Sequence, residues 1–147
     1  MRAVVQRVSW AKVEVDGEVT GAIERGLLVY LGAGKGDGAE ERAYVLSKIL
    51  GLRIFENDEG KMDKSVVDVG GSLLVVSQFT LYGDVRKGRR PSFDGAMPPE
   101  EAERAYDAFV AEARASGIRT ETGRFRADMK VSSLNDGPVT IWIDTAK

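Results

Sequence analysis

The chain has 147 residues, the length of one ordinary domain, so it can bury a core without a metal or disulfide to hold it. Its 21 Lys and Arg and 23 Asp and Glu give a net charge of -2, which provides no overall attraction to nucleic acid. It contains no Cys and no His, which excludes thiolate nucleophiles, the Ser-His-Asp triad and the usual zinc centres. Any catalysis must therefore use carboxylates, hydroxyls, Lys, backbone groups or groups of the substrate.

The N-terminal sequence shows no signal-peptide pattern, and no apolar run approaches the roughly 18 residues of a membrane span. We therefore expect a soluble, cytoplasmic protein with no membrane partner. No linker, repeat or low-complexity tract divides the chain, so we expect one domain over residues 1–147.

Strand patterns fill the first part of the chain. Residues 4–8 are mostly apolar, and residues 11–15 alternate between apolar and charged, as in a strand with one buried face. Asp16-Gly17 predicts a tight turn into a second strand over 19–23. Residues 26–31 are continuously apolar, which is typical of a buried central strand.

A helix is predicted over about 39–50, with Asp37 as its N-cap. A strand over 52–55 and a turn over 57–60 follow. The strongest strand pattern in the chain covers residues 72–79.

Pro98-Pro99 then opens an acidic helix over about 99–116, which Gly117 ends. Three short strands are predicted near 120–125, 130–134 and 139–144. This order of elements predicts an α+β domain with a largely antiparallel, barrel-like sheet and two main helices.

Gly34-Lys35-Gly36-Asp37-Gly38-Ala39 fits the loose dinucleotide-binding pattern between a strand and a helix. However, the chain does not continue as alternating strands and helices, and Asp37 would place a negative charge where a pyrophosphate binds. We interpret the segment as a flexible glycine connection.

A basic cluster follows the strongest strand. Arg86, Lys87, Arg89 and Arg90 place four positive charges within five residues. Three further cations, Arg2, Arg7 and Lys12, lie near the N-terminus, so a basic face could bind phosphates despite the low net charge. The alternative, a solvated loop, is equally consistent with the composition.

At residues 77–81 the apolar strand ends in polar residues, Ser77-Gln78-Phe79-Thr80-Leu81. Such an end can present a hydroxyl, an amide and backbone N–H groups at the rim of a sheet, which are the components of an oxyanion hole. The residues alone favour the alternative, an ordinary strand that runs into a turn at residues 82–84.

Asn135-Asp136-Gly137-Pro138 predicts a turn between two strands. A Gly-Pro bond is also a place where a cis peptide costs only about 0.5–1 kcal/mol. A cis bond here would fix the direction of the neighbouring carbonyl oxygens, and Gly137 would leave room beside them for a ligand.

Together these segments resemble one family, the D-aminoacyl-tRNA deacylases, over the whole length of the chain. The most specific signatures are residues 77–81 and Asn135-Asp136-Gly137-Pro138-Val139-Thr140. Residues 83–84 and 87–93 are also similar to the family. One position departs from it: the family usually reads Phe-Gly-Ala-x-Met where this chain has Phe125-Arg126-Ala127-Asp128-Met129, so Arg stands in place of Gly near the pocket rim.

The resemblance implies hydrolysis of the ester that joins a D-amino acid to the 3′-terminal adenosine of tRNA, and of glycine mischarged onto tRNA, as quality control of translation. It implies a homodimer with active sites at the subunit interface, no cofactor, no metal and no DNA partner. Ser77, Gln78, Phe79 and Thr80 would be the catalytic segment. Gly137 and Pro138, as a cis dipeptide from the other subunit, would bind the substrate and reject L-amino acids with Met129 and Asn135. The basic cluster would contact tRNA.

An activated ester needs little help to hydrolyse, so a site without His is credible. Backbone N–H groups near Phe79 and Thr80 would stabilise the oxyanion, and the adenosine 2′-hydroxyl would assist the attacking water. The rival mechanism makes Thr80 a covalent nucleophile, but no base lies beside it in the sequence. Two other classes remain open: a non-catalytic RNA-binding module and a small-molecule hydrolase that ignores RNA.

Overall fold

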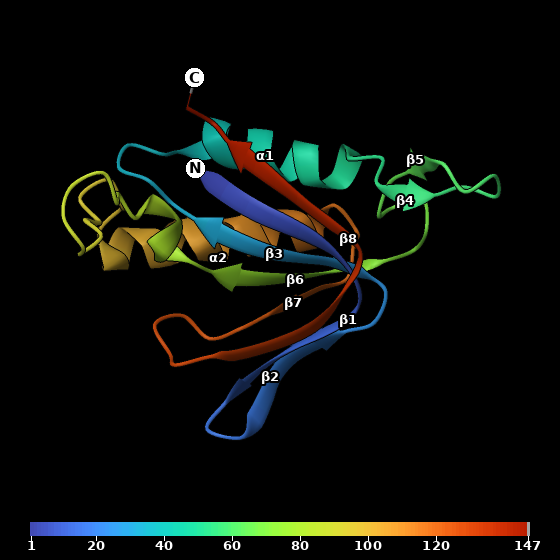
Figure 1. Ribbon diagram of the computed structural model, residues 1–147, viewed down its shortest axis with the longest axis horizontal. Helices are drawn as coiled ribbons and strands as arrows, with labels where there is room; N and C mark the ends of the chain where they lie inside the picture. The colour runs from blue at the N-terminus through green and yellow to red at the C-terminus, as the bar shows by residue number, and fades with distance from the viewer. Residues whose placement is uncertain (147) are drawn as a thin grey trace.

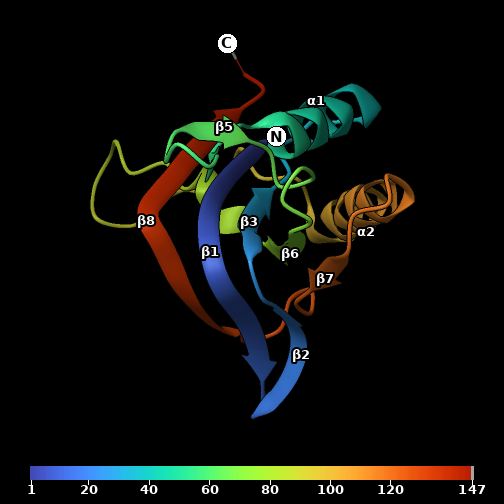
Figure 2. The same ribbon diagram turned by 90° about the vertical axis from the view of Figure 1, so that its right-hand side faces the viewer.

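The fold is built around one long strand, β1 (Arg2–Val15), in a computed structural model that describes residues 1–146. Along one edge β1 pairs with β2 (Glu18–Ile23) and then β3 (Gly26–Gly32), and along the other it pairs with β8 (Lys130–Asp144). All three pairings are antiparallel, and the sheet curls strongly around β1 (Figures 1 and 2).

The other half of the sheet is parallel. Strand β6 (Ser72–Ser77) lies parallel to β3, and β7 (Thr120–Thr122) lies parallel to β6. Parallel neighbours need long crossover connections, and the helices α1 (Ala39–Gly51) and α2 (Pro99–Ala115) lie in these two crossovers. The expected α+β architecture with a largely antiparallel, barrel-like sheet and two main helices is confirmed, and the two parallel pairings make the sheet a mixed one.

Two apolar cores share the sheet. One lies between the sheet and the helices and includes Val5, Val29, Val75 and Phe109. The other fills the inside of the curled sheet and includes Val13 and Leu74. Strand β1 contributes to both cores because irregularities in its pairing with β8, around Val8, change which side chains face inward.

Several elements differ from the sequence-based expectations. The strand expected over 52–55 shrinks to β4 (Phe55–Glu56), which pairs only with β5 (Met62–Lys64), and the strand over 120–125 shortens to β7. The strands expected over 130–134 and 139–144 are one strand, β8, because β1 pairs with both halves. The turn expected at residues 135–138 therefore lies inside a strand.

The cap of α1 also differs. Gly38 is the N-cap, and its N–H donates to the Glu41 carboxylate at 2.8 Å. The Asp37 carboxylate instead accepts from the Gly34 N–H at 2.6 Å and pairs with the Met1 ammonium at 2.7 Å. Asp37 thus ties the N-terminus to the glycine connection rather than capping the helix. No helix of the described residues is long and apolar enough to cross a membrane.

The curled sheet nearly closes where β2 meets β7. The Arg119 guanidinium donates to the Ala22 carbonyl at 3.4 Å across this seam. Gly21 allows β2 to approach β7 closely, because a methyl group at this position would overlap the Thr122 carbonyl.

We expect Gly21→Ala to lower the free energy of unfolding by about 1–3 kcal/mol, because the seam must open to admit the methyl group. Gly51→Ala is the matched control, since no atom lies within 4 Å of the added carbon. Urea unfolding of both variants measures the difference. Equal stability of the two variants would contradict the close seam.

Candidate active site

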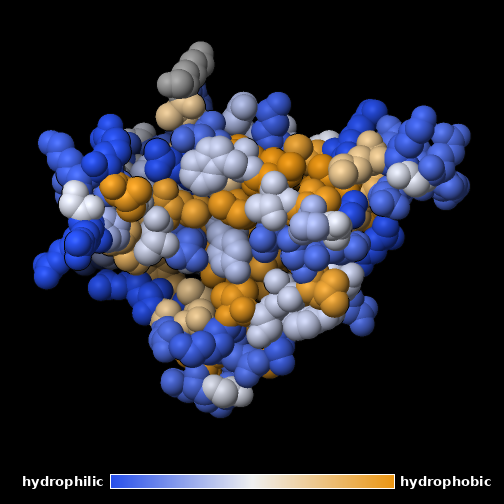
Figure 3. All heavy atoms as spheres, viewed as in Figure 1, coloured by the Kyte–Doolittle hydropathy of each residue, from blue (hydrophilic) through white to orange (hydrophobic). Residues whose placement is uncertain are grey.

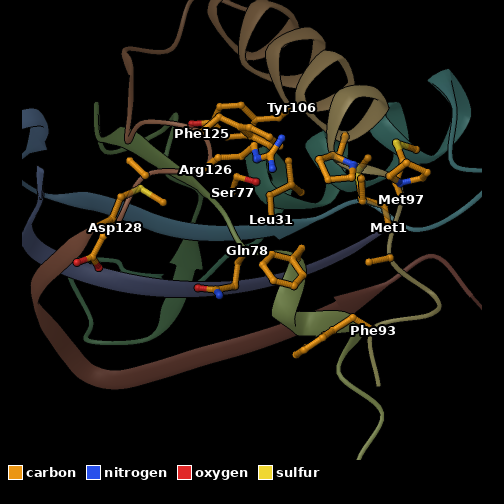
Figure 4. A pocket seen from close by; sticks show the side chains of 18 residues that line it. Met1, Leu31, Ser77, Gln78, Phe93, Met97, Tyr106, Phe125, Arg126 and Asp128 are labelled. Carbon is orange, nitrogen blue, oxygen red and sulfur yellow. The ribbon is translucent and has the colours of Figure 1, made fainter. Parts of the chain in front are cut away.

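A cavity of about 660 Å³ opens where the β6 strand ends. Ser77, Gln78 and Phe79 form one wall, and Leu31 of β3 lies beside them (Figure 4). The start of α2 and the loop before it form a second wall, with Met97 and Phe93. Residues 125–129 form a third wall, so the cavity lies between three segments that are far apart in the sequence.

The first wall is the end of a strand that turns into a short helix. The Gln78 N–H donates to the Leu31 carbonyl at 2.8 Å, which continues the pairing of β6 with β3. The chain then forms the 3₁₀ helix η1 (Phe79–Tyr82). The first N–H groups of a helix have no partner within it, and among residues 1–146 none is found for the backbone N–H of Phe79 or Thr80.

Arg2 anchors η1. Its Nη1 donates to the Leu81 carbonyl at 2.9 Å, and its guanidinium lies 4.4 Å from the centre of the Tyr82 ring. Its Nε donates to the Asp144 carboxylate at 3.1 Å, which links η1 to the end of β8. Arg2 is thus fully engaged in holding the site, and it is not part of a basic face for phosphates.

The Thr80 hydroxyl is not placed as a nucleophile within this subunit. It accepts a hydrogen bond from the Gln78 side-chain amide, and Thr80 is exposed outside the lining of the cavity. No Lys or Glu side chain is among the described residues that line the cavity. The described residues also hold no cluster of three or more Asp or Glu side chains suited to a metal ion.

Aromatic side chains flank the cavity. Phe79 is 54% exposed and meets Phe93 edge to face, with 5.1 Å between ring centres. Tyr106 and Phe125 lie opposite, with ring centres 6.1 Å apart. Burial raises the pKa of Tyr106 to about 12, and its hydroxyl donates to the Val75 carbonyl at 2.7 Å. Tyr106 is therefore a neutral, occupied donor at physiological pH rather than a base.

Gly137 and Pro138 lie outside this cavity, exposed on β8. Their peptide bond is cis, and Gly137 has φ +128°, a conformation that L side chains rarely adopt. Asn135 fixes the backbone around them, because its amide donates to the carbonyls of Arg7 at 3.0 Å and Val139 at 3.1 Å. Asn135 therefore positions the backbone around Gly137 and Pro138, and it does not line the cavity of its own subunit.

Arg7 holds the same segment from the other side and is only 6% exposed. Its Nε donates to the Asp136 carbonyl at 3.1 Å, and its Nη1 donates to the Ile54 carbonyl at 2.6 Å. A methyl group on Gly137 would lie 3.0 Å from the Arg7 Nη2 atom. Like Arg2, Arg7 positions a segment of the candidate site, and Lys12 pairs with Glu14 at 3.0 Å. None of the three N-terminal cations belongs to a free basic patch.

The predicted site residues therefore divide into two groups. Ser77, Gln78, Phe79 and Met129 line the cavity, whereas Thr80, Asn135, Gly137 and Pro138 do not line it within one subunit. Sequence reasoning did not assign Tyr106 and Phe125 to the site. Their apolar pattern is that of core residues, and nothing local reveals that both border a cavity.

The basic cluster occupies the tip of an exposed loop. Asp84 and Ser92 exchange backbone hydrogen bonds of 2.7 and 2.9 Å at the base of this loop. Arg86 donates to the Asp84 carboxylate at 2.7 and 2.9 Å, and this bonding lowers the pKa of Asp84 to about 2. The charge of Arg86 is thus compensated, while Lys87, Arg89 and Arg90 are exposed with no partner found among residues 1–146.

Known proteins resemble this chain over its whole length. A family model described as D-Tyr-tRNA(Tyr) deacylase matches residues 4–144. The D-aminoacyl-tRNA deacylase of Koribacter versatilis (strain Ellin345) is 62% identical over 147 residues, covering 100% of this chain and 99% of the relative. That of Sorangium cellulosum (strain So ce56) is 60% identical over 148 residues, with the same coverage.

A solved structure with the same fold carries a different name. The c-Myc DNA unwinding element binding protein is 45% identical to this chain and superimposes with a TM-score of 0.94. The match covers 100% of both chains.

Proposed function

The chain belongs to the D-Tyr-tRNA(Tyr) deacylase family, and from that premise we propose that it hydrolyses the ester between a D-amino acid and the 3′-terminal adenosine of tRNA. Free tRNA and the free amino acid are released. The role is chiral quality control in cytoplasmic translation. A single domain over residues 1–147 carries it out. The observation that carries the proposal is the cavity at the end of β6, where the described residues offer aromatic walls, N–H groups without a partner and a single carboxylate, Asp128, which pairs with Lys130.

The backbone of η1 supplies the electrostatic part of the reaction. Water forms a bond to the ester carbonyl carbon, and the carbonyl oxygen becomes an oxyanion beside the N–H groups of Phe79 and Thr80. The bond to the ribose 3′-oxygen then breaks, and the proton of the water passes to that oxygen. One such donor is typically worth about 10²–10³ in rate. The adenosine 2′-hydroxyl assists the water, since Tyr106 is occupied, Asp128 pairs with Lys130, and no Lys is among the described residues that line the cavity.

The cavity becomes complete in a homodimer. Gly137 and Pro138 are exposed outside their own cavity, and they would enter the partner's, where their carbonyls hold the substrate amino group and exclude an L side chain. The surface around them supports this arrangement. Trp10, Leu134 and Trp142 are 41%, 47% and 53% exposed on β1 and β8. Figure 3 shows apolar side chains gathered on this face, as expected for a surface that another protein covers.

Side-by-side assays of D-Tyr-tRNA, L-Tyr-tRNA and Gly-tRNA test the function. We expect D-Tyr-tRNA and Gly-tRNA to be hydrolysed and L-Tyr-tRNA to be spared, because an L side chain would meet the Gly137-Pro138 backbone. Tight binding of tRNA without release of amino acid would make the chain an RNA-binding module. Turnover of a free D-Tyr ester as efficient as that of D-Tyr-tRNA would make it a small-molecule hydrolase.

Thr80→Val tests the chemical step, because it deletes the hydroxyl and keeps both the branched shape and the backbone N–H. We expect a loss of less than about 10²-fold in rate, compared with about 10⁶-fold when a true hydroxyl nucleophile is removed. D-Tyr-tRNA that ends in 2′-deoxyadenosine and is charged at the 3′ position should still bind, but it should be a very poor substrate. An inactive Thr80→Val variant together with normal turnover of the deoxy substrate by the wild type, or a trapped acyl-Thr80 adduct, would establish covalent catalysis instead.

The exposed cations of the basic loop would contact the tRNA backbone. Arg86 is paired with Asp84, so the contacts would come from Lys87, Arg89 and Arg90. If two of these neutralise phosphates, replacing all three by Ala should flatten the slope of log K against log[salt] by about 1.4–1.8. Arg86→Ala should change the slope less. Equal slopes for the wild type and the triple variant would identify the cluster as a solvated loop.

A further inference from the structure

We propose that the Arg126 guanidinium, at the mouth of the cavity, binds the phosphodiester that precedes the 3′-terminal adenosine of the substrate. This inference rests on the proposed function and adds a binding residue to it. The position is the one at which this chain has Arg where the family pattern has Gly, so the family pattern supplies no role for the side chain.

The turn that carries Arg126 places its exposed side chain at the rim of the cavity. The Ala127 N–H donates to the Arg124 carbonyl at 3.2 Å, and Arg126 has φ +61°, in the left-handed region. This conformation reverses the chain between Phe125 and Met129, both of which line the cavity. In Figure 4 the Arg126 side chain extends from the loop toward Ser77 rather than away from the cavity.

The charge of Arg126 is uncompensated within the described chain. Asp128 is the single carboxylate among the described residues that line the cavity, and it pairs with Lys130 at 3.2 Å. No hydrogen-bond or ion-pair partner of the Arg126 guanidinium is found among residues 1–146. The Met1 ammonium, the other cation at the cavity, is paired with Asp37. An unpaired guanidinium beside mainly apolar walls favours an anionic ligand at this mouth.

The chemistry of the substrate limits what that anion can be. The carboxylate of the amino acid is esterified, its amino group is cationic, and the adenine and ribose are neutral. A phosphodiester of the tRNA backbone is therefore the anion that every substrate of this enzyme carries near its reacting end. The other anion that could bind here is the side-chain carboxylate of D-Asp or D-Glu, but only some substrates carry it.

The left-handed backbone provides a clean variant. Gly adopts φ +61° freely, whereas Arg does so at a cost. Arg126→Gly therefore removes the guanidinium and preserves the loop, and its thermal midpoint should equal or exceed that of the wild type. Arg126→Lys keeps a positive charge at this position but lacks the planar, forked guanidinium group. Arg104→Gln, an exposed position on α2 outside the cavity lining, is the control for net charge.

The test compares D-tyrosyl esters of adenosine, of the trinucleotide CCA and of full tRNA. The quantity measured is the kcat/KM for each phosphate-bearing ester divided by that for the adenosine ester. We expect Arg126→Gly to lower this ratio about tenfold for both CCA and tRNA, through KM rather than kcat. Arg126→Lys should recover part of the loss, and Arg104→Gln should leave the ratio unchanged.

Three results would overturn the assignment. An unchanged kcat/KM for all three esters in Arg126→Gly would show that the guanidinium is solvated at the rim. An equal loss on all three esters would mean that it binds the nucleoside or the ester. A loss confined to D-Asp-tRNA would mean that it binds an acidic side chain. If the wild type hydrolysed none of the esters, the proposed function would fail first, independently of any variant.

Discussion

Two arginines of β1 hold the two segments on which the site depends. Arg2 donates to the Leu81 carbonyl and so fixes η1, with its unpartnered N–H groups, at the wall of the cavity. Arg7, five residues further along, donates to the Asp136 carbonyl beside Gly137 and Pro138. Charged donors make strong hydrogen bonds, and a buried carbonyl without its donor is costly. The long ladder between β1 and β8 sets the distance between these two anchors, so it also sets where each segment can act.

This arrangement explains how a chain without His or Cys can support ester hydrolysis. The positions of backbone groups are fixed by hydrogen bonds and need no titration, so the oxyanion would be stabilised equally over a wide range of pH. The aromatic pairs Phe79–Phe93 and Tyr106–Phe125 suit a planar base rather than a reacting centre. In the proposed mechanism the protein would provide shape and dipoles, and the substrate would provide the functional group that assists the water.

Local patterns predicted the parts of the fold that local physics determines. The alternation in residues 11–15 and the apolar run over 26–31 each predict which side chains are buried, and both patterns of burial are observed. The local sequence patterns did not show which strands pair with one another across the sheet. Residues 135–138 have the composition of a turn, yet they lie inside β8, because β1 pairs with Asn135 before Gly137-Pro138 and with Thr140 after it, and the register between the two strands shifts across this segment.

The same limit applies to the site. The polar end of the strand at Ser77 is a local signal, but the residues alone favoured an ordinary turn there. The family resemblance assigned this segment to the site, and it also assigned Met129, on the loop that faces it across the cavity. The structure also divided the cations that composition had grouped together. Arg2, Arg7, Lys12 and Arg86 each have a partner in the fold, whereas no partner is found among residues 1–146 for Lys87, Arg89, Arg90 or Arg126. A count of charges cannot make this distinction, because it depends on which acid or carbonyl lies within reach.

The unpaired cations lie on two sides of one opening. The basic loop continues into Phe93, which packs against Phe79 at the cavity, while Arg126 lies on the opposite wall. A single strand of nucleic acid that ends in the cavity would pass between them. With a net charge of -2, long-range attraction of the whole protein for tRNA is absent. Under the proposed function, discrimination for a free 3′ end would follow from geometry, because a cavity of about 660 Å³ would admit one nucleoside and its phosphate but not a duplex.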